Sequence, residues 1–389
     1  MSLHSCHRHP SVTSPYTYVD HAAALAEVTR RLDGAGRVGL DTEADSLHHY
    51  FEKVCLIQIS VEGTQYIIDP LSGISLEAFL ATLTRTPLIL QGADYDLRML
   101  HKSFGFRPQA PVFDTKLAAH VLGHESVGLA ALAARYCGVA LSKSSQKADW
   151  SRRPLPERQL TYAADDTRYL MAIADAQTAE LTTLQRLAWH VECCERVVSA
   201  STVSEPRDEE AAWRVKGSFK LSPNELVYVR ALWQWRDAEA RAADRPPFYV
   251  LLNEGMIALA TWRAGHQQAP LDAGPAWLQR VTGGRRARLA QAIRAADHTP
   301  QADWPQPLPR QAWAPSAPEF QRQVDDLLAA CKTVAQELRI ESSFLASRAA
   351  LTSVVQHRPQ SLEQVMSMSG LMRWQATLLL PAIQRVLGR

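Results

Sequence analysis

The sequence predicts an α/β body with a mixed sheet, followed by two small all-α helical bundles. Three observations lead to this fold class. Short apolar runs typical of strands lie between residues 37 and 91. Helical patterns fill the chain from there to about residue 200, and strand-like runs almost vanish beyond it. A stretch with six prolines, residues 298–318, then divides the helical part in two.

Four apolar runs in the body predict strands. They are residues 37–41 (RVGLD), 54–60 (VCLIQIS), 65–69 (QYIID) and 87–91 (PLILQ). The first three runs are closely spaced, and the residues VEGT between the second and third are typical of a hairpin turn. We therefore expect these three strands to pair antiparallel.

The helical patterns of the body cover residues 94–104, 114–122 and 128–137, and a long segment from Pro156 to Val198. Proline is tolerated at the start of a helix because its missing N–H needs no partner there. The long segment is interpreted as either one bent helix or two consecutive helices.

The expected domain organisation follows from these patterns. It comprises a flexible tail (1–15), the α/β body (16–200), a polar linker (201–210), a first helical bundle (211–297), the proline-rich connector (298–318) and a second bundle (319–389). The first bundle holds 13 lysine and arginine residues against 7 acidic ones, a balance of +6 in a chain whose net charge is +2. A basic module on a more acidic body indicates a polyanionic partner, although an ordinary solvated helical surface gives the same asymmetry.

Composition bounds the class of protein. No apolar run approaches the roughly 20 residues that span a bilayer, and the N-terminus has no apolar region typical of a secretory signal. The six cysteines are scattered, with no C-x-x-C pair, which fits reduced thiols and gives no support to a structural zinc site. We expect a cytoplasmic protein with no membrane partner and no obligate protein partner.

Two carboxylates stand at the end of the first predicted strand. Because side chains alternate along a strand, Asp41 and Glu43 lie on one face, and Val38 and Leu40 on the other. Two like charges on one face repel, and burying an unpaired carboxylate costs several kcal/mol. A divalent metal ion between them would remove this cost.

Further acids occur at positions that suit a shared site. Asp94 and Asp96 directly follow the strand at 87–91, where an α/β sheet presents functional groups. Tyr162 and Asp166 are four residues apart on a helix and share a face, while spacing alone does not exclude Asp165. Each acid also has an ordinary structural explanation, such as a helix start or a solvated surface. Asp114 is explained as a helix N-cap.

Taken together, these carboxylates supply the hard oxygen ligands that Mg²⁺ and Mn²⁺ prefer. Two such ions about 4 Å apart activate a water and stabilise the leaving oxygen in phosphodiester hydrolysis. Tyr162 would then hold the attacking water. The pattern predicts a metal-dependent nuclease.

Three short segments carry a family resemblance. DTEADSL (41–47), DYDLRML (94–100) and YAADD (162–166) resemble the three motifs of the DEDD 3′–5′ exonucleases, in the subgroup with tyrosine in the third motif. The resemblance is closest to the ribonuclease D family and runs nearly continuously over residues 37–180. The two helical bundles resemble HRDC domains, which bind nucleic acids. The match is better for the first bundle than for the second.

This resemblance implies a ribonuclease H-like fold for the body and a role for each motif residue. It assigns metal binding and catalysis to four acids, and water positioning to a tyrosine: Asp41, Glu43, Asp96, Asp166 and Tyr162. It selects Asp166 over Asp165 because the third motif is Tyr-x-x-x-Asp.

Contacts with the 3′-terminal nucleotide are also implied, near Thr42 and Glu43 and at Leu47, which would wedge against the base. The family often has histidine or asparagine ahead of the aspartate in the second motif, where this chain has Gln91 and Gly92. Neither residue is a metal ligand. We therefore expect activity to survive and the grip on the terminal nucleotides to differ.

Basic residues flank the loop before the tyrosine-bearing helix: Lys143, Lys147, Arg152 and Arg153. They are candidates for salt-dependent contacts with phosphates, and solvated loop charges are the alternative. Trp150 in this loop is interpreted as a packing anchor.

The predicted function is removal of nucleotides from RNA 3′ ends as 5′-monophosphates, with tRNA precursors as natural substrates and two Mg²⁺ or Mn²⁺ ions as cofactors. One alternative keeps the chemistry but makes DNA the substrate, as in a proofreading exonuclease. Another is a catalytically silent nucleic-acid-binding scaffold, which the presence of all four acids and the tyrosine disfavours.

Overall fold

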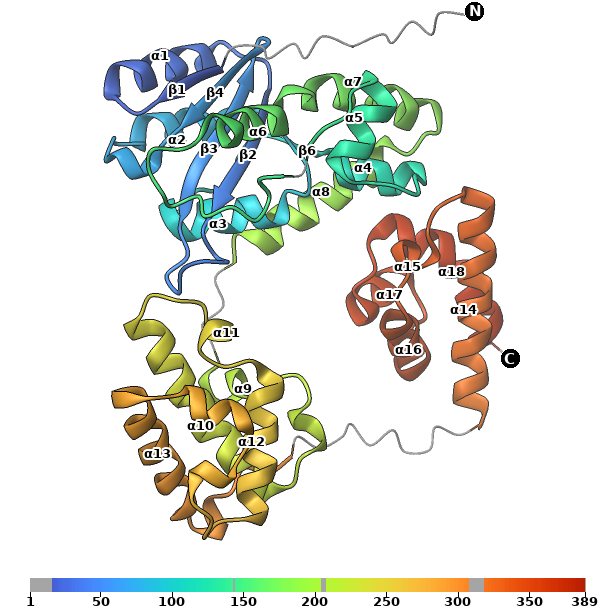
Figure 1. Ribbon diagram of the computed structural model, residues 1–389. Coiled ribbons are helices and arrows are strands. Elements are labelled where there is room, and N and C mark those ends of the chain that lie inside the picture. The colour runs from blue at the N-terminus through green and yellow to red at the C-terminus, as the bar shows by residue number, and fades with distance from the viewer. Residues whose placement is uncertain (1–15, 143, 204–207, 308–317, 389) are drawn as a thin grey trace, which may run out of the picture. The chain divides into compact units, whose positions relative to one another are not determined.

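The computed structural model describes residues 16–142, 144–203, 208–307 and 318–388. The predicted N-terminal tail and Lys143 therefore lie outside the described residues, as do parts of the linker and of the connector. The chain divides into two compact units (Figure 1). The first unit contains residues 1–44, 54–203 and 319–389, and the second contains residues 45–53 and 204–318.

A six-stranded mixed sheet forms the centre of the first unit. Its strands are β1 (Tyr16–Val19), β2 (Val38–Ala44), β3 (Val54–Val61), β4 (Thr64–Ile68), β5 (Leu88–Leu90) and β6 (Val112–Asp114). They lie in the order β1-β4-β3-β2-β5-β6. The strands β2, β3 and β4 pair antiparallel, and the outer pairs β1–β4, β2–β5 and β5–β6 are parallel. The predicted antiparallel core is confirmed.

The turn between β3 and β4 fixes the register of these two strands. Glu62 and Gly63 both adopt positive φ angles, 49° and 78°, as a two-residue hairpin with the right-handed twist requires. The outer strands β1 and β6 were not predicted. At four and three residues they are too short to show an alternating pattern.

Between residues 16 and 203, the described part of the chain contains eight α-helices around the sheet. They are α1 (Ala22–Asp33), α2 (Glu77–Arg85), α3 (Asp94–Phe104), α4 (Thr115–Leu122), α5 (Leu129–Cys137), α6 (Glu157–Arg168), α7 (Leu170–Thr183) and α8 (Leu187–Ser201). The long segment predicted as one or two helices is thus three. The chain breaks at Tyr169, and again near Gln185, whose φ of 57° ends the helical path.

The two faces of the sheet are covered differently. Side chains of α1, α2 and α3 pack with the apolar face of β2 and β3, which includes Val38, Leu40 and Ile57, in the largest core of the unit. On the opposite face α6 lies against β2, β3 and β4 and contributes two buried alanines, Ala163 and Ala164 (Figure 1). The polar end of β2 faces this second layer.

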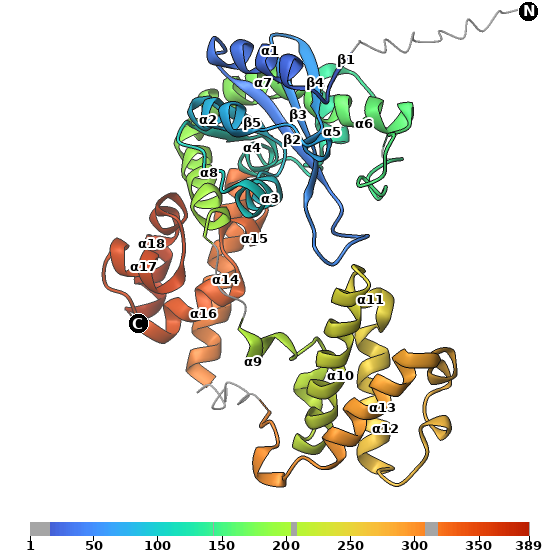
Figure 2. The same cartoon turned by 90° about the vertical axis from the view of Figure 1, so that its left-hand side faces the viewer.

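The second helical bundle belongs to the first unit. It consists of α14 (Pro318–Leu338), α15 (Ser342–Leu345), α16 (Arg348–His357), α17 (Leu362–Ser369) and α18 (Arg373–Leu387). Its core merges with side chains of α4, α7 and α8. Figure 2 shows the helices of the bundle beside α8. The sequence had left the placement of this bundle open.

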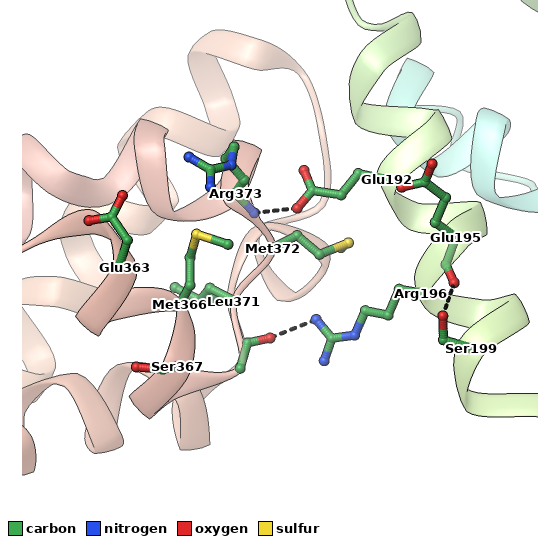
Figure 3. Close-up of a pocket in the computed structure, with 11 residues that line it drawn as sticks. Glu192, Glu195, Arg196, Ser199, Glu363, Met366, Ser367, Leu371, Met372 and Arg373 are labelled. Carbon is green, nitrogen blue, oxygen red and sulfur yellow. Dashed lines mark hydrogen bonds between the residues drawn. The ribbon is translucent and has the colours of Figure 1, made fainter. Parts of the chain in front are cut away.

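Polar contacts fix the bundle against α8. The Glu192 carboxylate accepts hydrogen bonds from the backbone N–H groups of Arg373 and Trp374 at the start of α18, and Arg196 donates to the Gly370 carbonyl at 2.6 Å (Figure 3). Beside these bonds the Trp189 and Trp374 rings stack, with centroids 4.9 Å apart. The Glu192 carboxylate at the start of α18 and the stacked tryptophan pair together fix how the second bundle packs on α8.

The second unit is a helical bundle built on α10 (Pro223–Ala242), with α9 (Glu209–Ala212), α11 (Pro247–Val250), α12 (Asn253–Gly265) and α13 (Gly283–Asp297). The predicted Ser–Pro start of α10 is a capping box, in which Ser222 and Glu225 satisfy each other's backbone N–H groups. Residues 45–53 group with this unit, where Asp244 accepts hydrogen bonds from the backbone of Tyr50 and Phe51. Among the described residues, no helix has both the length and the apolar character needed to cross a bilayer.

Candidate active site

The strand β2 carries the first two carboxylates. Leu40 is fully buried in the main core, so the alternation of the strand turns Asp41 and Glu43 together toward the opposite face. The register with β3 shifts between Glu43 and Ala44, which ends regular pairing just after the second acid. Such irregularities often occur next to functional sites because they re-aim a side chain.

Asp96 enters the site from the first turn of α3, where the helix dipole favours an acid. Its Oδ1 accepts two hydrogen bonds from Thr42, one from the backbone N–H at 3.1 Å and one from the hydroxyl at 2.6 Å. The Asp96 side chain is buried and is thereby tied to the residue between Asp41 and Glu43.

The helix α6 supplies the remaining groups. Tyr162 and Asp166 lie one helical turn apart, and the tyrosine hydroxyl donates a hydrogen bond to the Asp166 carboxylate. Asp165 instead forms an ion pair with Arg168, with 3.1 Å between the Asp165 Oδ1 and Arg168 Nε atoms. The geometry therefore distinguishes the two aspartates that spacing alone had left open.

Three carboxylates converge closely enough to share a cation. One oxygen each of Asp41, Glu43 and Asp166 lies within 4.8 Å of the others. Asp96 is not in this group of three, although its charge acts on each member. The cluster consists of hard oxygen donors and suits a divalent cation.

Burial and mutual repulsion raise the pKa values of these groups. Loss of solvation raises the pKa of Glu43 to about 9, with the charges of Asp166 and Asp96 adding to the shift. The pKa of Asp41 is raised for the same reasons. Burial raises the pKa values of Asp96 and Asp166 to about 7, although hydrogen bonds from Thr42 and Tyr162 oppose the rise. Such shifts mark a site that lacks a positive charge.

These pKa shifts predict an unusual pH dependence of stability without metal. A carboxyl group whose folded-state pKa is raised stabilises the fold below its unfolded pKa near 4, and this contribution is lost as pH rises through the folded pKa. In EDTA we expect the melting temperature to fall between pH 6 and pH 9. Thermal unfolding across that range checks this, and a melting temperature that stays level or rises would contradict the electrostatic description of the site.

The other predicted contact residues have varied environments. Leu47 is 45% exposed, and Lys147 is exposed on the loop before α6. Arg152 is exposed and pairs with Asp149, with 3.0 Å between Nε and Oδ2. Trp150 is buried in a core with Ala163 and Ala164, so its interpretation as a packing anchor is confirmed.

Two other side chains singled out from the sequence, those of Arg153 and Gln91, form hydrogen bonds within the protein. The Arg153 guanidinium donates to both oxygens of the Asp69 carboxylate, each at 2.6 Å, and to the Cys55 carbonyl. Gln91 in the second motif donates to the Val127 carbonyl at 2.8 Å. Both side chains hold elements of the fold together.

Sequence reasoning missed part of the role of Asp114. It caps α4 as predicted, accepting from the backbone N–H groups of Lys116 and Leu117. The same carboxylate also accepts from the N–H groups of Gly92 and Ala93, which precede α3. Asp114 therefore fixes the start of the helix that carries Asp96. The positive φ of Gly92, 79°, accompanies this turn.

Comparisons with known proteins identify the family of this chain. A family model described as a 3′–5′ exonuclease matches residues 16–182, and the HRDC domain model matches residues 225–264. A ribonuclease D of Xanthomonas oryzae pv. oryzae is 34% identical over 356 residues, which cover 87% of this chain and 93% of that protein. The chain belongs to the ribonuclease D family. It is therefore a 3′–5′ exoribonuclease, and RNA is its substrate class.

Two solved structures show the same overall fold. The crystal structure of Escherichia coli RNase D is 25% identical, covers 96% of this chain and 99% of its own, and has a TM-score of 0.72. A protein from Bifidobacterium adolescentis has the same fold, with a TM-score of 0.81, 23% identity and coverage of 96% and 97%. The predicted ribonuclease H-like body followed by a helical region is confirmed.

Proposed function

We propose that this ribonuclease D family member trims structured RNA precursors, such as those of tRNA, one nucleotide at a time and releases 5′-monophosphates. The proposed catalytic set is Asp41, Glu43, Asp96, Tyr162 and Asp166. The observation that carries the proposal is the approach of three carboxylates to within 4.8 Å. The Escherichia coli relative is described as involved in structured RNA processing, which supports the substrate class.

The residues fit a divalent cofactor. The carboxylates are oxygen donors with raised pKa values, so a cation that replaces their protons relieves both repulsion and desolvation. We propose that two ions, Mg²⁺ or Mn²⁺, are held by Asp41, Glu43, Asp96 and Asp166. When bound, they supply an activated water and stabilise the leaving 3′ oxygen.

The protein's own groups perform the positioning. Thr42 orients Asp96 through two hydrogen bonds, which leaves the other carboxylate oxygen for the site. The Tyr162 hydroxyl has a strongly raised pKa because of burial and the nearby acids, so it stays protonated and can orient the attacking water. None of these groups recognises a particular base. We therefore expect the enzyme to have only weak sequence preference.

Substrate contacts outside the catalytic set are part of the same proposal. Thr42 and Glu43 would meet the terminal nucleotide, and the exposed Leu47 would stack against its base. Lys147 and Arg152 would contact phosphates of the incoming strand, contributing salt-dependent affinity.

The second unit offers a surface for unpaired RNA. A pocket of about 620 Å³ is bordered by the exposed aromatic residues Phe248 and Tyr249, and by Arg280 and Arg285. Aromatic faces stack on bases, and arginines attract phosphates. The eleven described residues that line this pocket include no acid. We propose that the pocket binds a single-stranded segment of the substrate.

Replacing both aromatic residues, Phe248→Ala with Tyr249→Ala, should weaken binding of single-stranded RNA about tenfold, since a stacked base contributes on the order of 1–3 kcal/mol. Fluorescence anisotropy in EDTA measures this without cleavage. Phe219→Ala removes another exposed aromatic residue of the same unit, one that does not line the pocket, and serves as the control. Equal affinities for the double variant and the control would refute the role of the pocket.

One assay tests the proposed function as a whole. The protein is given 5′-labelled RNA and DNA of the same sequence, with Mg²⁺, with Mn²⁺ and with EDTA. The proposal predicts that RNA alone shortens stepwise from its 3′ end, only with metal, and that a tRNA with an extended 3′ end is trimmed. Equal degradation of DNA would favour the proofreading alternative, and binding without cleavage would favour the silent scaffold.

A further inference from the structure

Gln58 is a polar side chain without a partner in the core of the first unit. It lies in the middle of β3 and is 0% exposed. Neither its Nε2 nor its Oε1 atom has a hydrogen-bond partner among the described residues. A buried amide normally finds partners, because leaving it unpaired after desolvation is unfavourable. Gln177, the other glutamine at 0% exposure, donates through Nε2 to the Thr115 carbonyl at 2.9 Å, and only its Oε1 atom lacks a partner among the described residues.

The position of Gln58 relates it directly to the carboxylate cluster. In the antiparallel ladder Gln58 is paired with Asp41, so the two side chains stand on the same face of the sheet. Directly paired residues have Cβ atoms about 4.5–5.5 Å apart, and their diagonal neighbours are within reach of long side chains. Glu43, which pairs with Leu56, is such a diagonal neighbour.

The remaining neighbours of Gln58 on that face provide few hydrogen-bond partners for its amide. Leu56 lies two residues before it on the same strand, and Ile67 pairs with it from β4; both are apolar and buried. Ser60, two residues after it, accepts a hydrogen bond from Gln65 at 3.3 Å. The helix that covers this face contributes the methyl groups of Ala163 and Ala164. The carboxyl groups that the strand ladder brings next to Gln58 are those of Asp41, directly paired with it, and Glu43, on the diagonal.

We infer that Gln58 is a positioning residue of the metal site, whose amide N–H₂ donates to the Asp41 carboxylate when a cation is bound there. The inference rests on the proposed function and extends it to a residue outside the four acids and the tyrosine. Metal-ligating carboxylates are themselves hydrogen-bonded by neighbouring groups, and loss of such a partner typically lowers metal affinity 10- to 100-fold.

Gln58→Leu separates this role from simple packing. Leucine is apolar and of similar size, so the metal-free melting temperature should stay level or rise because two unpaired polar atoms are removed. Mn²⁺ affinity, measured by calorimetry on the full chain without RNA, should fall 10- to 100-fold. Gln58→Met, which adapts to irregular cavities, repeats the test if leucine packs badly.

Gln177→Leu is the matched control. It breaks the hydrogen bond to Thr115, so its melting temperature should fall while its Mn²⁺ affinity stays that of the parent. If both Gln58 variants are folded and bind Mn²⁺ as the parent does, Gln58 has no positioning role, even though the parent still binds metal and degrades RNA. A parent chain that neither binds Mn²⁺ nor degrades RNA overturns the proposed function and this inference together.

Discussion

Asp166→Asn is expected to lower the rate of RNA cleavage at least about a thousandfold, or roughly 4 kcal/mol of barrier. Asp166 is one of the three acids whose oxygens converge within 4.8 Å, and an amide cannot supply the charge that holds a cation. The fold should survive, because the substitution removes one of several repelling charges. In EDTA at pH 8 the variant should melt at a higher temperature than the parent.

Asp165→Asn is the control for this experiment. It changes the neighbouring residue in the same way but breaks only the ion pair with Arg168, which lies outside the cluster. Initial rates on 5′-labelled RNA with Mn²⁺ compare the two variants. A near-normal rate for Asp166→Asn, or an equal loss in both variants, would show that the assignment of Asp166 is wrong.

Gly123→Ala is expected to have the largest effect on stability. Gly123 ends α4 with a φ of 81°, and a Cβ atom added there would lie 1.8 Å from the carbonyl oxygen of Arg339 in the second bundle. Left-handed backbone strain costs about 1–2 kcal/mol, and overpacking typically adds about 1–3 kcal/mol. The bundle should loosen from α4 and α8, which separates the stacked Trp189 and Trp374 rings.

Gly138→Ala provides the comparison for this substitution. Gly138 ends α5 with a similar φ of 70°, but nothing lies within 4 Å of an added Cβ atom. It therefore carries the backbone strain alone. Thermal unfolding followed by tryptophan fluorescence should show a clearly lower midpoint for Gly123→Ala than for Gly138→Ala. Equal midpoints would mean that the contact with Arg339 is not tight.

The approach of the carboxylates to one another could largely be predicted because these residues obey local periodicities. Asp41 and Glu43 share a face by the two-residue repeat of a strand, and Tyr162 and Asp166 do so by the helical repeat. What spacing could not decide was which aspartate of α6 faces the cluster. That depends on the rotation of the helix against the sheet, which the buried Ala163 and Ala164 set through tertiary packing.

Features that depend on distant contacts escaped prediction. The outer strands β1 and β6 form by pairing with the neighbouring strands β4 and β5, and their own sequences are too short to show a pattern. The docking of the second bundle depends on contacts such as that of Arg186, which bridges the carbonyl oxygens of Val121 and Leu338. These partners are 65 and 152 residues from Arg186, and no local signal joins them.

The lack of a hydrogen-bond partner for Gln58 and the second role of Asp114 also depend on contacts distant in the sequence. In the sequence, the glutamine in VCLIQIS is a polar residue in a mostly apolar strand, and the aspartate in VFDTK is an ordinary helix cap. Their importance becomes visible only in the register of β2 with β3 and in the approach of residues 92 and 93 to Asp114.

The most direct test of the central claim is anomalous diffraction from a crystal of the protein soaked in Mn²⁺. We expect manganese peaks bounded by oxygens of Asp41, Glu43 and Asp166, with Asp96 beside them, and loss of those peaks in Asp166→Asn. Carboxylates that remain apart with no anomalous peak between them, in a crystal whose enzyme degrades RNA with Mn²⁺, would contradict it.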